Sequence, residues 1–220
     1  MEPAKSKNEA IIARAKGLAN VPWCEEYEKM ISGMLYNAFV PELLTGRFRA
    51  RKLASQFNAP IPDEMTEEEL MSRRADILKQ FFGSLGKNSF IEPPLNVDYG
   101  CNILIGDDFY SNFGLTILDC CLVEIGDRVM FGPGVNILSA THQTDVQSRR
   151  DGVEFALPVF IGDDCWIGGN VSILPGVTIG NGCTIGASSV VTKSIPAYSV
   201  AVGSPARVIK KVAEAEPVSK

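Results

Sequence analysis

Residues Ile161–Pro196 read IGDDCWIGGNVSILPGVTIGNGCTIGASSVVTKSIP, and their aliphatic residues recur every six positions without a slip. The repeated position is held by Ile161, Ile167, Ile173, Ile179, Ile185 and Val191. A second, small or aliphatic residue follows each of them four positions later, from Cys165 to Ile195. A period of six matches neither the turn of a helix nor the alternation along one long strand. It predicts a coil of short strands joined by tight corners, where Gly, Asn and Asp gather.

We therefore expect a mainly β protein built on a parallel β-solenoid, in which each turn buries the apolar face of its neighbour. A membrane span is the alternative, because Cys165–Thr192 contain no charged residue and are long enough to cross a bilayer. The stretch is rich in Gly, Asn, Ser and Thr, and Pro175 lies near its middle. A six-residue period would also scatter the aliphatic side chains around a helix, so the sequence favours the solenoid.

Composition and charge narrow the possible partners and compartments. The chain has 220 residues and a formal net charge of −5, and no stretch alternates aromatic with basic residues, which argues against a nucleic-acid partner. Its six cysteines include no CxxC pair, and Cys165 and Cys183 occupy inward repeat positions. This spacing indicates reduced thiols and a cytoplasmic protein. The N-terminus lacks the apolar segment of a secretory signal.

The segment before the coil predicts an N-terminal arm at residues 1–22 and a small helical domain at residues 23–84. A first helix is expected at Glu25–Tyr36. A second helix begins at Pro41, which suits the first turn, and runs to about Phe57. The expected apolar side of this second helix is Leu43, Leu44, Phe48, Leu53 and Phe57. Thr66 and Glu69 have the spacing of a capping box and predict the start of a third helix, which Gly83 ends.

The coil itself is expected at residues 85–211, followed by a polar tail at residues 212–220. Its first turn is irregular, and the six-residue period is clear from Ile125 until it stops at His142. Residues 143–158 are polar and carry no repeat, and the period resumes at Ile161. A long insertion in a compact repeat is usually functional, so we expect this protruding loop to serve the activity.

His142 is the single histidine of the chain, and it lies where the rigid repeat ends and the loop begins. Such a place on a fixed scaffold is typical of a functional side chain, although a lone histidine is by default a surface or core residue. One histidine cannot build a three-histidine metal site, so no metal is expected. Proton transfer is the chemistry left for a single imidazole, with Glu154 of the loop as a carboxylate that can hold one tautomer.

At this point the chain resembles the hexapeptide-repeat acyltransferases. The resemblance is carried by Thr141-His142, by Ile161–Gly169, by Pro175–Gly180 and by Gly203–Lys210. Within that family it is most similar to the maltose, galactoside and nodulation-type sugar O-acetyltransferases, since EKMISGMLY at Glu28–Tyr36 matches their helical N-terminal domain. The similarity covers roughly residues 25–211.

This resemblance implies a left-handed β-helix and a homotrimer with active sites between subunits. It implies transfer of an acetyl group from acetyl-CoA to a sugar hydroxyl, with His142 as general base and Glu154 beside it. Backbone N–H groups near Gly168 and Gly169 are the expected oxyanion donors. Asn112 positions the acceptor and supports charge, and further acceptor contacts are implied at Asn37, Tyr110 and Asp119.

The same resemblance implies a coenzyme A surface along the coil. Trp166 is expected beside the acetyl group and the pantetheine arm. The remaining coenzyme contacts carried over from the family pattern are Gly168, Gly169, Ala187, Thr192, Lys193, Arg207 and Lys210. Cations near a diphosphate are electrostatically favourable, although Lys210 can equally be a solvated charge of the tail.

Two alternatives remain open from the sequence. An enzyme of the same chemistry could use an amine, a xenobiotic or serine as acceptor, and the helical N-terminal domain disfavours serine. A non-catalytic β-helix scaffold could keep the repeat without the activity. The scaffold predicts no saturable binding of coenzyme A, whereas both enzyme readings require it.

Overall fold

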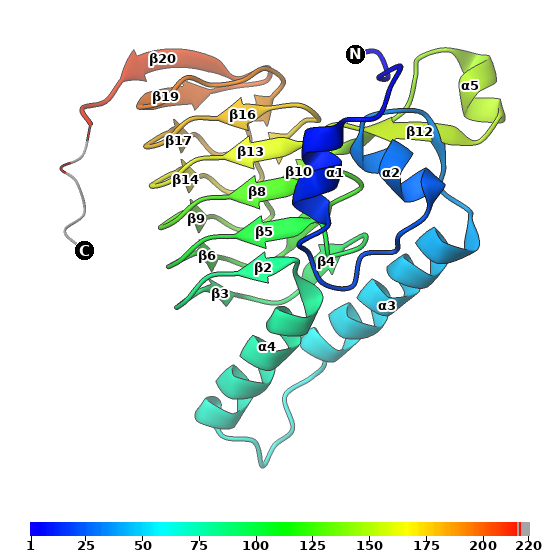
Figure 1. The fold of residues 1–220 in the computed structure, drawn as a ribbon. Helices are drawn as coiled ribbons and strands as arrows, with labels where there is room; N and C mark the ends of the chain where they lie inside the picture. The colour runs from blue at the N-terminus through cyan, green and yellow to red at the C-terminus, as the bar shows by residue number, and fades with distance from the viewer. Residues whose placement is uncertain (215, 217–220) are drawn as a thin grey trace.

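The computed structural model describes residues 1–214 and 216. Short parallel strands wind into a coil, and four helices of the N-terminal part pack along one side and one end of it (Figure 1). The strands stack into three sheets that run the length of the coil. This arrangement confirms the predicted solenoid.

Each of the three sheets takes one strand from successive turns. The first contains β2 (Ser84–Leu85), β5 (Ile103–Ile105), β8 (Val123–Ile125), β13 (Val159–Ile161) and β16 (Thr178–Ile179). The second contains β4 (Leu95–Val97), β7 (Leu115–Leu118), β10 (Asn136–Leu138), β15 (Ser172–Ile173) and β18 (Val190–Val191). The third contains β3 (Phe90–Ile91), β6 (Tyr110–Ser111), β9 (Met130–Phe131), β14 (Trp166–Ile167), β17 (Thr184–Ile185), β19 (Ser199–Val202) and the antiparallel β20 (Arg207–Lys211).

The six-residue period of the sequence becomes a stack of buried side chains. Ile161 pairs with Ile179, Ile167 with Ile185, and Ile173 with Val191. Each pair is eighteen residues apart, so three six-residue blocks make one turn and each block supplies one strand to one sheet. All six side chains are buried in the core of the coil. Burial of this continuous apolar column is the main stabilising term of the fold.

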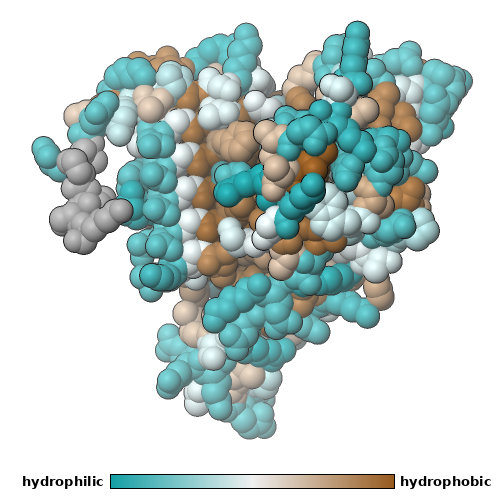
Figure 2. All heavy atoms as spheres, in the orientation of Figure 1, coloured by the Kyte–Doolittle hydropathy of each residue, from teal (hydrophilic) through white to brown (hydrophobic). Residues whose placement is uncertain are grey.

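The corners between the first and third sheets are built from Asp and Asn residues. A side-chain oxygen of Asp127 accepts a hydrogen bond from the backbone N–H of Asp107, and Asp163 does the same for Asp127. Asn181 continues the ladder by accepting from the N–H of Asp163. Figure 2 shows hydrophilic residues stacked in a column along this edge of the coil. These side chains supply acceptors to corner N–H groups that have no sheet partner.

The helices of the N-terminal part are α1 (Glu9–Ala15), α2 (Glu25–Ile31), α3 (Pro41–Phe57) and α4 (Glu67–Phe81). The second predicted helix is confirmed at Pro41–Phe57, with Pro41 in its first turn. The capping box is also confirmed, because Thr66 and Glu69 exchange side-chain and backbone hydrogen bonds. Leu44 and Phe48 are exposed, which corrects the expectation that they belong to the buried side of α3.

Residues 1–22 are packed rather than loosely held. Ile12 and Ala15 of α1 are buried in the cluster that also holds Tyr27 and Met30. The ammonium group of Lys7 lies 2.8 Å from Glu25 and 2.6 Å from Glu28. The expected arm is therefore part of the helical layer, because the apolar face of its short helix finds a partner in α2.

The loop between the two repeat segments is folded. It contains β11 (Ala140–Thr141), the short helix α5 (Val146–Arg150) and β12 (Val153–Ala156), which pairs antiparallel with β11. The two-residue strand β1 (Tyr36–Asn37) pairs with the other edge of β12. This small sheet ties the helical layer to the loop. Of the predicted tail at residues 212–220, residues 215 and 217–220 lie outside the described part.

In residues 1–214 and 216, no helix combines the length and the apolar character needed to cross a membrane. All six cysteines are in the described part of the chain, and each is a free thiol.

Candidate active site

His142 follows β11 at the mouth of a pocket of about 550 Å³. Its side chain is 54% exposed, so one face of the ring is open to solvent. The pocket lies between the coil, the loop and α3, and its walls include Ala38, Phe39, Leu44, Arg47, Arg51, Asp98, Leu118, Cys120, Ala140, Thr141 and Glu154. A titratable imidazole thus faces a cavity large enough for a small molecule.

Glu154 is the carboxylate beside this imidazole, as the sequence predicts. Its Oε2 lies 3.6 Å from Nε2 of His142, and its side chain is 21% exposed. This separation is within ion-pair range and longer than an ordinary hydrogen bond. Oε1 of the same carboxylate accepts a hydrogen bond from the hydroxyl of Tyr36. A carboxylate placed in this way can hold one imidazole nitrogen protonated and leave the other free to accept a proton.

Charged side chains stand among the apolar residues of the pocket wall. Arg47 donates hydrogen bonds of 2.6 Å to the hydroxyl of Tyr99 and to the carbonyl oxygen of Ala38. Asp98 is partly buried, and the thiol of Cys120 donates to its carboxylate. Burial raises the pKa of Asp98. The wall therefore offers donors and acceptors suited to hydroxyl groups.

Asp119 lies beneath the pocket and does not line it. Its side chain is fully buried, and Oδ1 accepts from the N–H groups of Asp98 and Tyr99 at 3.1 and 2.9 Å. Oδ2 accepts from the N–H of Asn102. This geometry gives Asp119 a structural role, whereas Asp98 and Cys120 stand at the pocket surface where the sequence led us to expect Asp119.

Tyr110 and Asn112 lie on another part of the coil. Tyr110 is in β6, and its ring stacks on Phe90 with ring centroids 6.1 Å apart. The side-chain oxygen of Asn112, two residues further on, accepts from the N–H of Phe113. Neither residue lines the pocket of His142. One subunit therefore presents the predicted acceptor residues on two separate surfaces.

Two of the predicted coenzyme residues, Trp166 and Lys210, lie in one row of paired residues on the third sheet. Tyr110 pairs with Met130, Met130 with Trp166, Trp166 with Thr184 and Thr184 with Val200. Val200 pairs in turn with Lys210 of β20. Trp166 and Lys210 are thus three strand spacings apart, roughly 14 Å, on one outward face.

Gly168, Gly169 and Ala187 lie at the corner that ends this face. The N–H of Gly168 donates to the carbonyl oxygen of Ile185 at 2.8 Å, which corrects the expectation that Gly168 offers a free oxyanion donor. Gly169 is partly buried, and its N–H has no backbone partner within the described residues. Of the two glycines, Gly169 is therefore the one that can supply an oxyanion donor.

The remaining predicted contacts are exposed. Thr192 and Lys193 follow β18, and Arg207 begins β20. Asn37 is exposed in β1, where its side-chain oxygen accepts from the N–H of Phe39. Its neighbours Ala38 and Phe39, and not Asn37 itself, line the pocket.

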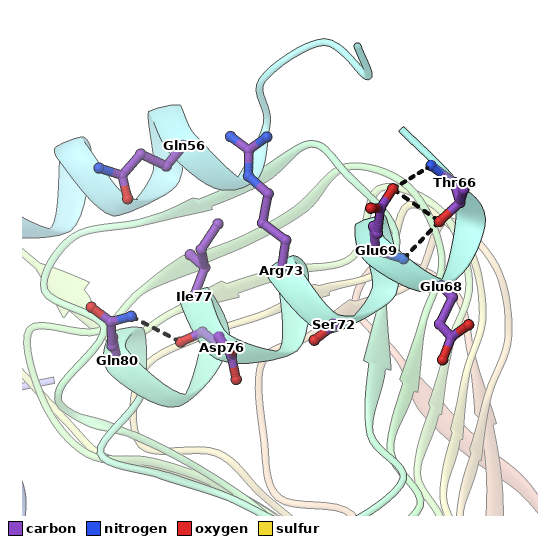
Figure 3. Close-up of a pocket in the computed structure, with 9 residues that line it drawn as sticks. All are labelled: Gln56, Thr66, Glu68, Glu69, Ser72, Arg73, Asp76, Ile77 and Gln80. Atoms are coloured by element: carbon purple, nitrogen blue, oxygen red, sulfur yellow. Dashed lines mark hydrogen bonds between the residues drawn. The ribbon is translucent and has the colours of Figure 1, made fainter. Parts of the chain in front are cut away.

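A larger hollow of about 830 Å³ lies between α3 and α4, away from all of these residues (Figure 3). Figure 3 shows that Arg73 and Ile77 point from α4 toward the helix that carries Gln56, and that the capping box of Thr66 and Glu69 lies at the N-terminal end of α4. None of its lining residues is a histidine or a cysteine. Within the described chain, no three His, Cys, Asp or Glu side chains are grouped closely enough to hold a metal ion.

Comparison with known proteins identifies the family to which this chain belongs. The family described as "Maltose acetyltransferase hexapeptide capping motif" matches residues 29–86, and "Bacterial transferase hexapeptide (six repeats)" matches residues 158–193. The chain is 40% identical over 185 residues to galactoside O-acetyltransferase of Escherichia coli (strain K12), covering 84% of this chain and 88% of that protein. The chain belongs to the hexapeptide-repeat acetyltransferase family.

Solved structures of hexapeptide-repeat acetyltransferases agree with this assignment. A maltose O-acetyltransferase from Clostridium difficile 630 superposes with a TM-score of 0.82 at 48% identity, covering 87% of this chain and 99% of that chain. A galactoside acetyltransferase in complex with coenzyme A gives 0.80 at 38% identity, covering 87% and 92%. The resemblance stated from the sequence and the β-helix that it implies are thereby confirmed.

Sequence reasoning missed several residues of this hexapeptide-repeat acetyltransferase pocket. Tyr36, Arg47, Arg51, Asp98 and Cys120 all reach the surroundings of His142 from segments far away in the chain. The alternation along β7 offered a usable signal, since Ile117 and Asp119 point inward and Leu118 points to the pocket.

Proposed function

We propose that this protein transfers the acetyl group of acetyl-CoA to a hydroxyl group of a sugar. The observation that carries the proposal is the pairing of His142 with Glu154 at a pocket whose wall also carries Arg47, Arg51 and Asp98. Membership of the hexapeptide-repeat acetyltransferase family supports the acetyl transfer, and the galactoside and maltose acetyltransferases among its relatives support a sugar acceptor.

In the proposed reaction, His142 accepts the proton of the acceptor hydroxyl while that oxygen attacks the thioester carbonyl carbon. The carbonyl π bond opens to an oxyanion in a tetrahedral intermediate. When the carbonyl re-forms, the carbon–sulfur bond breaks, and the imidazolium returns the proton to the departing thiolate. The products are an O-acetyl sugar and free coenzyme A, and His142 ends in its starting state.

Glu154 supports this cycle electrostatically. A carboxylate beside the ring stabilises the imidazolium that forms during attack and fixes which nitrogen carries the proton at rest. The N–H of Gly169 is our candidate donor to the oxyanion, because the N–H of Gly168 is already used within the coil.

We assign coenzyme A to the outward face of the third sheet. Trp166 offers an exposed aromatic surface for the pantetheine arm, and the cations Lys193, Arg207 and Lys210 near the upper end of the coil suit the phosphate groups. Gly169 and Ala187 border this surface, and Thr192 offers a hydroxyl next to Lys193.

We also propose that the working enzyme is a homotrimer whose sites lie between subunits. Tyr110 and Asn112 are separated from His142 within one chain, so one acceptor can meet them together only if a second subunit contributes. A head-to-tail contact that closes after three steps provides this repeatedly. The free thiols of all six cysteines support the expected cytoplasmic location.

The direct test is turnover of acetyl-CoA against a panel of mono- and disaccharides, with release of free coenzyme A as the signal. His142→Ala is expected to lower kcat by roughly 10² to 10⁴, the usual effect of losing a general base. Lys79→Ala, on the exposed side of α4 and away from the pocket of His142, is the control and should retain the wild-type rate. Unchanged turnover in His142→Ala would count against the assignment. Absence of saturable coenzyme A binding by calorimetry would favour the scaffold reading.

A further inference from the structure

Tyr36 connects the helical layer to the candidate catalytic base. It lies in β1, directly opposite Glu154 of β12 in their antiparallel pairing. Its side chain is 1% exposed, and its hydroxyl donates a hydrogen bond to Oε1 of Glu154. The other oxygen of that carboxylate, Oε2, is the one that faces His142. A single carboxylate therefore bridges a buried hydroxyl and the imidazole.

The direction of this hydrogen bond is fixed by chemistry. An ionised carboxylate only accepts, so the phenol is the donor. Burial raises the pKa of Tyr36, and the nearby Cys120, Glu154 and Tyr99 act in the same sense, so the hydroxyl keeps its proton. A buried O–H without a partner is energetically unfavourable, which favours keeping the Glu154 oxygen in place.

Glu154 needs such an anchor if it is to act on His142. A glutamate side chain has three rotatable bonds, and at the pocket wall its carboxylate could otherwise turn toward solvent. The wall also contains Arg47 and Arg51, which attract a carboxylate away from the imidazole. The Tyr36 hydroxyl holds Oε1 of Glu154 in place by a hydrogen bond, and this leaves Oε2 directed at the imidazole of His142.

We propose that Tyr36 is a positioning residue for acetyl transfer: it holds Glu154 in the orientation that fixes the tautomer and the direction of His142. The proposal rests on the proposed function of His142. It gives the helical N-terminal layer a part in the reaction that involves no contact with either substrate. Strand β1 completes the loop sheet, and its tyrosine sets the geometry of the base.

A purely structural role makes different predictions. The Tyr36 ring is buried in the cluster that also contains Ile12, Tyr27 and Met30. Tyr36→Phe keeps that ring and removes only the hydroxyl. If the hydroxyl served stability alone, the variant would unfold more easily and the remaining folded enzyme would have the wild-type kcat and pH profile.

Tyr27→Phe is a matched control. Tyr27 is fully buried in the same cluster, and its hydroxyl donates a 2.7 Å hydrogen bond to Oδ1 of Asn102. Both variants lose one buried hydroxyl and one hydrogen bond to a side chain. Only Tyr36 contacts Glu154, so a catalytic difference between the two variants reports on positioning.

The experiment measures kcat, KM for acetyl-CoA and the pH profile of kcat for wild type, both tyrosine variants, Glu154→Ala and the double variant Tyr36→Phe/Glu154→Ala. We expect Tyr36→Phe to lower kcat roughly tenfold, a coupling of about 1.4 kcal/mol, with little change in KM. Tyr27→Phe should keep the wild-type kcat and pH profile.

The double variant separates the outcomes. If Tyr36 acts through Glu154, removing its hydroxyl has no further effect once Glu154 is Ala. Additive losses in the double variant, or equal kcat values for the two tyrosine variants, would overturn the positioning role while leaving the proposed function intact. Wild-type activity in His142→Ala would instead remove the proposed function itself. Should Tyr36→Phe fail to fold, Glu154→Ala still has to lower kcat at least tenfold, because Tyr36 acts only through that carboxylate. A wild-type kcat in Glu154→Ala would overturn the positioning role.

Discussion

His142 and Asn112 lie beyond opposite ends of two neighbouring parallel strands. Strands β7 and β10 pair through Thr116 with Asn136 and Leu118 with Leu138. Asn112 precedes β7, whereas His142 follows β10, so the paired strands lie between them. A strand of four residues spans about 13 Å, which is too far for both side chains to contact one hydroxyl.

Mixed trimers test whether two subunits share each site. We expect His142→Ala and Asn112→Ala each to be at least tenfold slower than wild type when purified alone. Equal amounts of the two variants, unfolded together and refolded, should regain roughly a quarter of wild-type activity. In such mixed trimers about one site in four receives an intact His142 from one subunit and an intact Asn112 from its neighbour. The control mixes His142→Ala with Glu154→Ala. Both residues belong to the same pocket of one subunit, so the activity of that mixture should not exceed the average of the two variants measured alone. No gain in the first mixture, with mixed trimers verified by mass spectrometry, would contradict a shared site.

The cations Arg207 and Lys210 on strand β20 predict that the affinity for coenzyme A depends on charge. We expect Arg207→Ala and Lys210→Ala each to raise the Kd for coenzyme A about fivefold, equivalent to about 1 kcal/mol for an exposed charge contact. The effect should shrink as salt is added, because exposed charges are screened. Calorimetric titration at two salt concentrations measures both quantities. Lys79→Ala, which removes an equally exposed cation on α4, should bind coenzyme A like wild type. Equal affinities for all four proteins would place the coenzyme elsewhere.

Successive turns of the coil stack so closely at Gly168 that no side chain fits there. A Cβ atom there would lie 2.6 Å from the backbone nitrogen of Ala187 and 2.9 Å from the carbonyl oxygen of Ile185. Gly168→Ala should therefore destabilise the protein by about 1–3 kcal/mol, as overpacking usually does. We expect its Tm to fall by roughly 2–12 °C. In Gly17→Ala the nearest atom would be 3.7 Å away, so its Tm should stay close to that of wild type. A Tm for Gly168→Ala equal to that of wild type would show that the corner can relax.

Much of the fold was predictable because its signals are local. The six-residue period requires only that consecutive blocks be compared, and Ile161 pairs with Ile179 as that period demands. Helix α3 carries its own start signal in Pro41, and α4 carries a capping box. The packing of residues 1–22 was missed because α1 has only seven residues, too few for its buried side, Ile12 and Ala15, to show a clear helical period. Their burial depends on contacts with Tyr27 and Met30 of α2, which no pattern within residues 1–22 indicates.

The site was predicted less completely for the same reason. His142 and Glu154 are marked by the interruption of the repeat, which is visible along the chain. Tyr36 and Asp98 reach the same place through β1 and the coil, and no local pattern announces those contacts. Asp119 was wrongly expected at the pocket because residues next to each other in an extended chain point to opposite sides. Its neighbours Leu118 and Cys120 line the pocket, whereas Asp119 is buried.

The buried Asp119 predicts how stability depends on pH. Burial raises the pKa of its carboxyl group to about 8, and the backbone N–H donors of Tyr99 and Asn102 act in the opposite direction. In the unfolded chain the pKa is about 3.9. Between these values the folded protein binds a proton that the unfolded chain does not, so the contribution to stability is full below about pH 4. It is lost as the pH rises toward 8.

Urea unfolding of wild type and Asp119→Asn at pH 5.0 and pH 8.5 isolates this contribution. The asparagine side chain is of similar size and does not titrate, so any fixed cost of the substitution is the same at both pH values. We expect the free energy of unfolding of wild type to fall by at least about 1 kcal/mol more than that of Asp119→Asn between the two. If both proteins lose the same amount, the N–H groups of Asp98, Tyr99 and Asn102 stabilise the ionised carboxylate enough to cancel the effect of burial. In that case Asp119 is charged in the folded protein at neutral pH, and its negative charge acts on Asp98 at the pocket wall.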